Sequence, residues 1–83
     1  MNFEEAVERV NGLKVRPNDD ELLQLYGLYK QGKMGDCNTG APGVFDIKGK
    51  AKHNAWASRK GMSKEDAQKE YIALAEKLIR AQG

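Results

Sequence analysis

The segment YGLYKQGKMGD, residues 26–36, indicates a helix that carries a dense set of aromatic and basic side chains. Residues three and four positions apart are neighbours on a helix. Tyr26, Tyr29 and Lys33 would therefore share one side, and Lys30 would border it. Such a surface is compatible with the edge of a core flanked by solvated lysines. It is equally compatible with a site for an aromatic, negatively charged ligand, and the spacing alone leaves both interpretations open.

The composition indicates one globular domain spanning residues 1–83. Hydrophobic residues make up 40% of the chain and charged residues 31%, and a chain of this length has room for one modest core. With 14 lysines and arginines against 12 acidic residues, the net charge is +2. This charge is too small to indicate a general nucleic-acid coat or a membrane-surface binder. Any basic site must therefore be local.

The cysteine content and the N-terminal segment predict a soluble, cytoplasmic protein. The single cysteine, Cys37, cannot form an internal disulfide, whereas secreted chains of this size usually contain several. The N-terminal segment MNFEEAVERV is acidic and amphipathic, unlike a signal peptide. The sequence also lacks a run of about 18 apolar residues, so we expect no transmembrane helix.

Apolar residues recur at helical spacing in four segments, and no alternation typical of hairpin strands is present. The expected helices cover residues 2–12, 18–34, 49–60 and 63 to the C-terminus. Asn18 precedes Glu21 by three positions, as in the capping boxes that start helices. Ser63 and Asp66 have the same spacing. The sequence therefore predicts an all-α fold with four helices around one core.

A long loop, GDCNTGAPGVFDI at residues 35–47, separates the second and third expected helices and contains three glycines and one proline. Loops of this length are usually functional or packed down by their own side chains. We expect Val44, Phe45 and Ile47 to pack this loop against the domain.

The stretch between Ile47 and Met62 contains no acidic residue. Its basic residues are Lys48, Lys50, Lys52, Arg59 and Lys60. Aromatic faces stack on nucleobases and ammonium groups bind phosphate oxygens, so this stretch beside helical phenols suits a phosphorylated nucleotide. A helix starting near Gly49 would add the positive end of its dipole. A solvated lysine face is the alternative, and we favour it for Lys33, Lys48 and Lys50.

A series of short motifs, in order along the whole chain, resembles the acyl-CoA-binding protein family. The motifs are YxxYKQ from Tyr26, GD at Gly35, PG at Pro42, DxKGKAK from Asp46, AW at Ala55, KGMSxEDA from Lys60 and YI at Tyr71. The resemblance implies an all-α, four-helix up-down-down-up bundle. It further implies a protein without enzymatic activity or cofactor that binds medium- to long-chain fatty acyl-CoA esters. Such a protein acts as an intracellular carrier and pool former in lipid metabolism.

The resemblance also implies a role for each tyrosine of the chain. Tyr29 would stack on the adenine ring. Tyr26, Lys30 and Lys52 would bind the ribose 3′-phosphate and its surroundings. Tyr71, on the last helix, would contact the ligand near the ribose and pantetheine.

The acyl chain of such a ligand needs an apolar groove, because each buried methylene contributes about 0.8 kcal/mol. We expect this groove between helices, near Leu22, Leu23 and the first helix. We also expect a monomer that makes transient contact with membranes or with the enzymes that produce and consume acyl-CoA.

Two positions depart from the family pattern. A basic residue on the first helix approaches the ligand phosphates in animal members, but Asn11 occupies that position. Lys14 and Arg16 lie further along, so we assign no phosphate role to the first helix. His53 replaces a tryptophan that is common in the third helix.

Other functions remain as alternatives from the residues alone. No nucleophile with a suitable base can be assembled, so we do not expect an enzyme. His53 is the only histidine and has no clustered partners, so we expect no metal site. A small nucleotide- or nucleic-acid-binding domain could use KGKAK with tyrosine stacking, although we expect no nucleic-acid partner. A protein-interaction or signalling module of the same fold is the other alternative.

Overall fold

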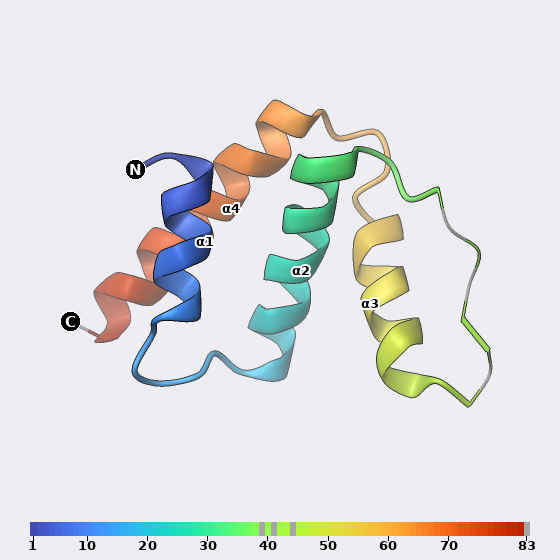
Figure 1. Ribbon diagram of the computed structural model, residues 1–83, viewed down its shortest axis with the longest axis horizontal. Helices are drawn as coiled ribbons and strands as arrows, with labels where there is room; N and C mark the ends of the chain where they lie inside the picture. Colours follow the sequence, from blue (N-terminus) through green and yellow to red (C-terminus); the bar gives the residue numbers. More distant parts are fainter. Residues whose placement is uncertain (39, 41, 44, 83) are drawn as a thin grey trace.

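The computed structural model describes residues 1–38, 40, 42–43 and 45–82, and these residues form four helices (Figure 1). They are α1 (Phe3–Asn11), α2 (Asp19–Met34), α3 (Ile47–Ala57) and α4 (Lys64–Gln82). In Figure 1, α1 and α4 run downward whereas α2 and α3 run upward. Seen from the opposite end, this is the up-down-down-up order that the resemblance implied. The described residues contain no strand. The predicted all-α bundle is therefore confirmed.

Side-chain caps explain where these helices begin. The Asn18 side chain accepts a hydrogen bond from the Glu21 amide at 2.8 Å, and Glu21 accepts from the Asn18 amide at 3.0 Å. This is the predicted capping box, and it satisfies amides that a helix start leaves without partners. Ser63 caps α4 by accepting from the Asp66 amide at 3.1 Å. Asn2 caps α1 in the same way, which the sequence analysis did not predict.

The third helix differs from its expected range of 49–60. It starts at Ile47, because the Asp46 side chain caps it by accepting a hydrogen bond from the Gly49 amide at 2.9 Å. It ends at Ala57, and the backbone continues in tight turns such as the 3.0 Å hydrogen bond from the Arg59 amide to the Trp56 carbonyl. The short, polar cap at Asp46 outweighs the apolar spacing on which the prediction depended.

The main core lies between α1, α2 and α4, whereas α3, among the helices of the described residues, packs against α2 alone. The buried core residues are Phe3, Ala6, Leu25, Leu28, Tyr71, Ala75 and Leu78. Leu13 packs against this cluster from the connection after α1. On the other side of α2, Trp56 of α3 is buried. The domain therefore has α2 as its central helix, as Figure 1 shows.

The contact between α2 and α3 depends on Gly27. A Cβ atom at this position would overlap the backbone carbonyl of Ala55, so only glycine lets the two helices approach this closely. We expect Gly27→Ala to lower the free energy of unfolding by about 1–3 kcal/mol, because overpacking forces backbone shifts. Gly12→Ala is the matched control, since a Cβ there would make only ordinary contacts of 3.6 Å and more. Urea unfolding of both variants measures this; equal stability would contradict the prediction.

A hydrogen-bonded junction joins the end of α2 to the turn before α4. The Gln31 side-chain amide donates to Asp36 Oδ1 at 2.9 Å and to the Met62 carbonyl at 2.7 Å. The Gly61 backbone amide also donates to Asp36 Oδ1, at 2.9 Å. Donation from Gly61 and then from Gln31 lowers the pKa of the Asp36 carboxyl below its ordinary value. Asp36 therefore stays ionised at neutral pH and anchors the start of the long loop.

The prediction that Phe45 and Ile47 pack the loop against the domain is wrong. Phe45 is 96% exposed and Ile47 is 79% exposed. Gly27 brings α2 and α3 together near Ala55, but the first turn of α3 stands apart from α2 across a groove. Ile47 consequently has no core to enter. Val44, the third residue of that prediction, lies outside the described residues.

Candidate ligand-binding site

Two lysines gather around one tyrosine where α2 faces α3. Lys30 Nζ lies 5.9 Å from the centroid of the Tyr26 ring, and Lys52 Nζ lies 5.4 Å from it. Lys30 Nζ also lies 5.4 Å from the ring centroid of buried Trp56. Cations at such distances are attracted to aromatic faces. The aromatic rings thus hold two like charges near each other, which suits a doubly charged phosphate.

Three aromatic rings from three helices meet where α1, α2 and α4 pack together. The centroid of Phe3 lies 6.0 Å from that of Tyr29 and 5.2 Å from that of Tyr71. The ring centroids of Tyr29 and Tyr71 lie 6.5 Å apart. Tyr71 is buried, whereas Tyr29 remains partly exposed. Phe3 and Tyr71 therefore support Tyr29 while leaving part of its ring accessible.

The hydroxyl of Tyr71 is held in its neutral form. Burial raises the pKa of this phenol, and the neighbouring Tyr29 raises it further. Both effects disfavour the phenolate. Tyr71 can therefore donate a hydrogen bond at neutral pH.

A groove of about 500 Å³ runs between α2 and the first turns of α3. It is lined by Arg16, Asp19, Leu22, Leu23, Tyr26, Ile47, Lys48, Ala51 and Lys52. Leu22, Leu23 and Ile47 make its walls apolar, and Tyr26 and Lys52 belong both to the groove and to the lysine cluster. An apolar groove thus runs directly into a positively charged group of side chains.

Known proteins resemble this chain in sequence and in fold. A family model described as acyl-CoA-binding protein matches residues 1–75. The chain belongs to the acyl-CoA-binding protein family. Acyl-CoA binding and carriage are the function of this family, so the family and function predicted from the sequence are confirmed.

Relatives in distant organisms support this membership over nearly the whole chain. The acyl-CoA-binding protein homolog 1 of Caenorhabditis elegans is 53% identical over 83 residues, which cover 100% of this chain and 96% of that protein. The crystal structure of Oryza sativa acyl-CoA-binding protein 2 superposes with a TM-score of 0.91 at 39% identity, covering 95% of this chain and 88% of that chain. The solution structure of the yeast acyl-CoA-binding protein has a TM-score of 0.78 at 50% identity, with coverages of 96% and 93%.

The structure divides the residues that the family resemblance assigns to the ligand into two groups. Tyr26 and Lys30 of α2 lie beside Lys52 of α3, whereas Tyr29 and Tyr71 meet beside Phe3. Helical spacing had placed Tyr26, Tyr29 and Lys33 on one side of α2. Tyr29 and Lys33 do lie on one side, because Lys33 lines a hollow together with Phe3, whose ring centroid is 6.0 Å from that of Tyr29. Tyr26 is the residue set apart, since it lies beside Lys52 of α3.

The groove also differs from the expected one. Leu22 and Leu23 line it, but its opposite wall comes from α3 rather than from α1. Arg16, in the connection between α1 and α2, brings a positive charge to the groove, which the sequence analysis did not predict. A basic residue next to Pro17 was the available signal. Asn11 is exposed at the end of α1, and His53 is partly buried on α3.

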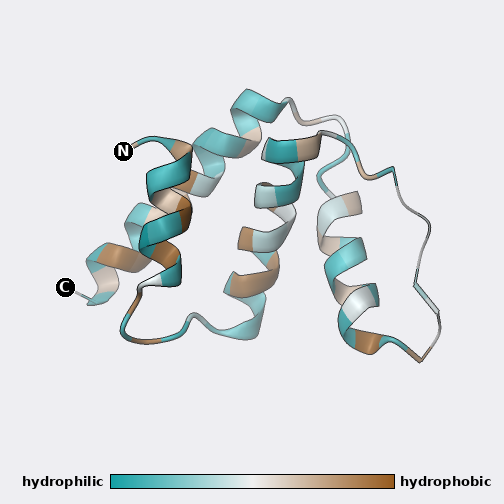
Figure 2. Ribbon diagram, in the orientation of Figure 1, coloured by the Kyte–Doolittle hydropathy of each residue, from teal (hydrophilic) through white to brown (hydrophobic). Residues whose placement is uncertain are grey.

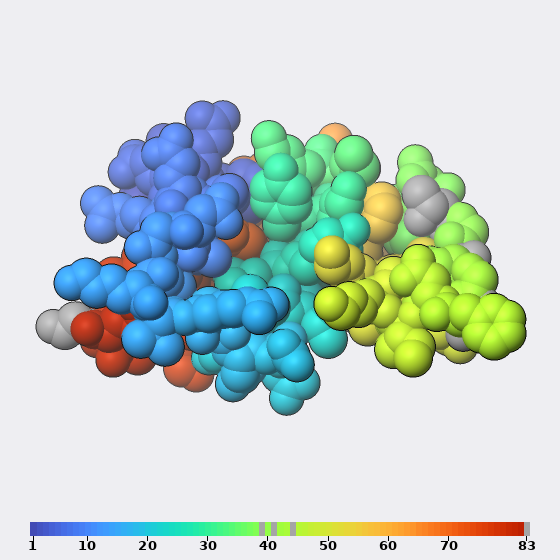
Figure 3. All heavy atoms as spheres, turned by 60° about the horizontal axis from the view of Figure 1, so that its bottom comes forward, coloured from blue at the N-terminus to red at the C-terminus, as the bar shows by residue number. Residues whose placement is uncertain are grey.

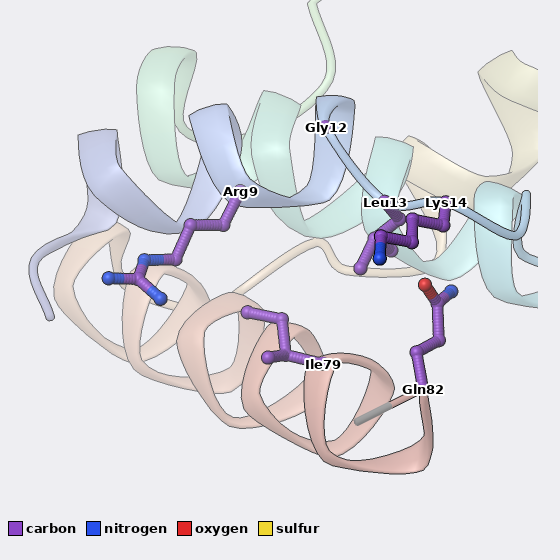
Figure 4. Close-up of a pocket in the computed structure, with 6 residues that line it drawn as sticks. All are labelled: Arg9, Gly12, Leu13, Lys14, Ile79 and Gln82. Atoms are coloured by element: carbon purple, nitrogen blue, oxygen red, sulfur yellow. The ribbon is translucent and has the colours of Figure 1, made fainter.

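A second hollow, of about 380 Å³, lies between the C-terminal ends of α1 and α4 (Figure 4). It is lined by Arg9, Gly12, Leu13, Lys14, Ile79 and Gln82. None of the residues predicted to bind acyl-CoA lines it, and it contains no aromatic side chain that could stack on adenine. We therefore place the candidate site at the groove between α2 and α3.

Among the residues that the structure describes, no group of three or more histidine, cysteine, aspartate and glutamate side chains could hold a metal ion. In that part of the chain, none of the helices has the length and the apolar character that crossing a bilayer requires.

Proposed function

We propose that residues 1–83 form one domain that binds medium- to long-chain fatty acyl-CoA esters in the cytoplasm and carries them as a monomer. It performs no chemistry and needs no cofactor. The observation that carries this proposal is that Tyr26 and Lys52 belong to both the charged cluster and the apolar groove. One amphipathic ligand can therefore occupy both parts at once.

Two sets of side chains hold the nucleotide end of the ligand: the lysines around Tyr26, and the aromatic rings around Tyr29. Tyr26, Lys30 and Lys52 bind the ribose 3′-phosphate, because two ammonium groups beside one phenol can neutralise a dianion. Tyr29 stacks on the adenine with its accessible ring face. The neutral hydroxyl of Tyr71 donates a hydrogen bond near the ribose and pantetheine. The contacts among these side chains support the assignment.

The acyl chain lies in the groove between α2 and α3, against Leu22 and Leu23. Ile47 and Ala51 provide the opposite wall. Lys48 and Lys52, which line the groove, are exposed, so ligand can enter and leave past them without unfolding. The protein then exchanges its ligand in transient contacts with membranes or with enzymes that make and use acyl-CoA.

Affinity across a series of saturated acyl-CoA esters tests the groove. Each added methylene that enters the groove is expected to tighten binding about fourfold, because its burial contributes about 0.8 kcal/mol. The gain should stop once the chain outgrows the groove. Calorimetric titration with esters of increasing length measures this. Affinity that ignores acyl length and falls steeply with salt would instead indicate a nucleic-acid or nucleotide binder.

A further inference from the structure

The first turn of α3 and the residue that precedes its cap expose two large apolar side chains close together. Phe45 is 96% exposed and Ile47 is 79% exposed, on either side of the capping residue Asp46. We call residues 45–48 the α3 tip. Figure 2 shows hydrophobic colour at the base of α3, at the outer end of the molecule. Full exposure of a phenylalanine is unfavourable in water, so this tip is a candidate contact surface.

Basic side chains surround the α3 tip. Lys48, Lys50 and Lys52 are all exposed, and no acidic residue occurs between Ile47 and Met62. The nearest carboxylate, that of Asp46, is engaged in capping the helix through the Gly49 amide. The groove beside the tip holds Arg16 and Asp19, whose charges offset each other, so the excess positive charge comes from the lysines of α3. The protein as a whole is nearly neutral, so this positive charge is a local feature.

The shape of the α3 tip favours a fluid surface over a folded protein. In the space-filling view, the yellow-green segment around the start of α3 projects at one end of the molecule (Figure 3). A stable protein interface needs about 800 Å² from each partner, with many well-packed residues. Two exposed apolar side chains flanked by lysines are too few for that. They match the interfacial region of a bilayer, where apolar side chains enter and lysines contact anionic headgroups.

We propose that the α3 tip docks the protein onto anionic membranes, with Phe45 and Ile47 in the interface and Lys48 and Lys50 over the headgroups. This inference rests on the proposed carrier function and specifies the surface used for exchange. Ile47 and Lys48 also line the groove, so docking brings its mouth to the bilayer. An acyl chain dissolved in the membrane can then enter the groove without crossing bulk water.

Vesicle flotation without acyl-CoA tests the docking. The wild type is expected to float with vesicles of phosphatidylcholine containing about 30% phosphatidylserine, and much less with phosphatidylcholine alone. Phe45→Ser should weaken the partitioning about tenfold, because the phenyl ring leaves water on docking. Lys50→Gln should weaken it about fivefold, and added salt should reduce the remainder.

Met34→Ser is the matched control for Phe45→Ser. Met34 is also apolar and its side chain is 58% exposed. It is the last residue of α2, and this end of α2 lies at the opposite end of the bundle from the α3 tip (Figure 1). This variant should float like the wild type. Phe45 and Lys50 do not line the groove, so calorimetry should give both variants the wild-type affinity for palmitoyl-CoA.

Two results would overturn the proposal. One is a wild type that does not float with the anionic vesicles, which would leave a protein as the occupant of the tip. The other is Phe45→Ser partitioning like the wild type. Because flotation uses no acyl-CoA, failure of the acyl-CoA titration would count against the carrier function alone.

Discussion

Palmitoyl-CoA is expected to bind about a thousandfold more tightly than either free CoA or palmitate. Ten buried methylenes would contribute about 8 kcal/mol. Stacking adds about 1–3 kcal/mol, and charge-assisted phosphate contacts add about 1.5–3 kcal/mol each. Association costs about 4–15 kcal/mol, and each fragment must meet most of this cost with only part of the contacts. The ester gains both sets of contacts for a single loss of freedom.

Titration calorimetry with the three ligands at equal ionic strength measures this difference. The structural basis is the pair of side chains that the groove and the charged cluster share, Tyr26 and Lys52. Equal affinity for palmitate and palmitoyl-CoA would show that the nucleotide end contributes nothing. Equal affinity for CoA and palmitoyl-CoA would show that the acyl chain stays in water. Either result would refute the assignment of two linked subsites.

Lys52→Ala is expected to weaken palmitoyl-CoA binding by about 10- to 150-fold, the effect of losing a hydrogen bond to a charged group. Lys52 is exposed, and its ammonium group lies 5.4 Å from the Tyr26 ring centroid. Alanine is a good helix former, and the side chain has no core contact, so the bundle should remain folded. The loss should therefore appear in binding and be small in unfolding.

Lys50→Ala is the control that isolates position from charge. It removes the same charge from the same helix, but Lys50 neither lines the groove nor approaches Tyr26 in the contacts that define the cluster. Calorimetry of both variants with palmitoyl-CoA, at two salt concentrations, separates a specific contact from general attraction. If both variants lost affinity equally, the phosphate role of Lys52 would be wrong.

Local patterns in the sequence predicted most of the helical framework. The capping pairs Asn18 with Glu21 and Ser63 with Asp66 act within one turn, so their effect on helix starts can be deduced without the fold. Apolar periodicity likewise identified four helices, and the order of the motifs identified the family. The residue roles in the site came from that resemblance, and the spacing of the tyrosines alone had left a core edge as an equal alternative.

Only the tertiary structure shows how these elements face one another. Tyr26 turns to α3 while Tyr29 meets Phe3, a division that depends on which helices lie on each side of α2. The groove, the junction at Asp36 and the exposure of Phe45 also depend on residues far apart in the chain. Helix caps and periodicity act over three or four residues, so the sequence determined the helices. The shape of the site was decided by the close approach of α2 and α3 at Gly27 and by the groove left between these helices beside it. No local pattern in the sequence encodes either feature.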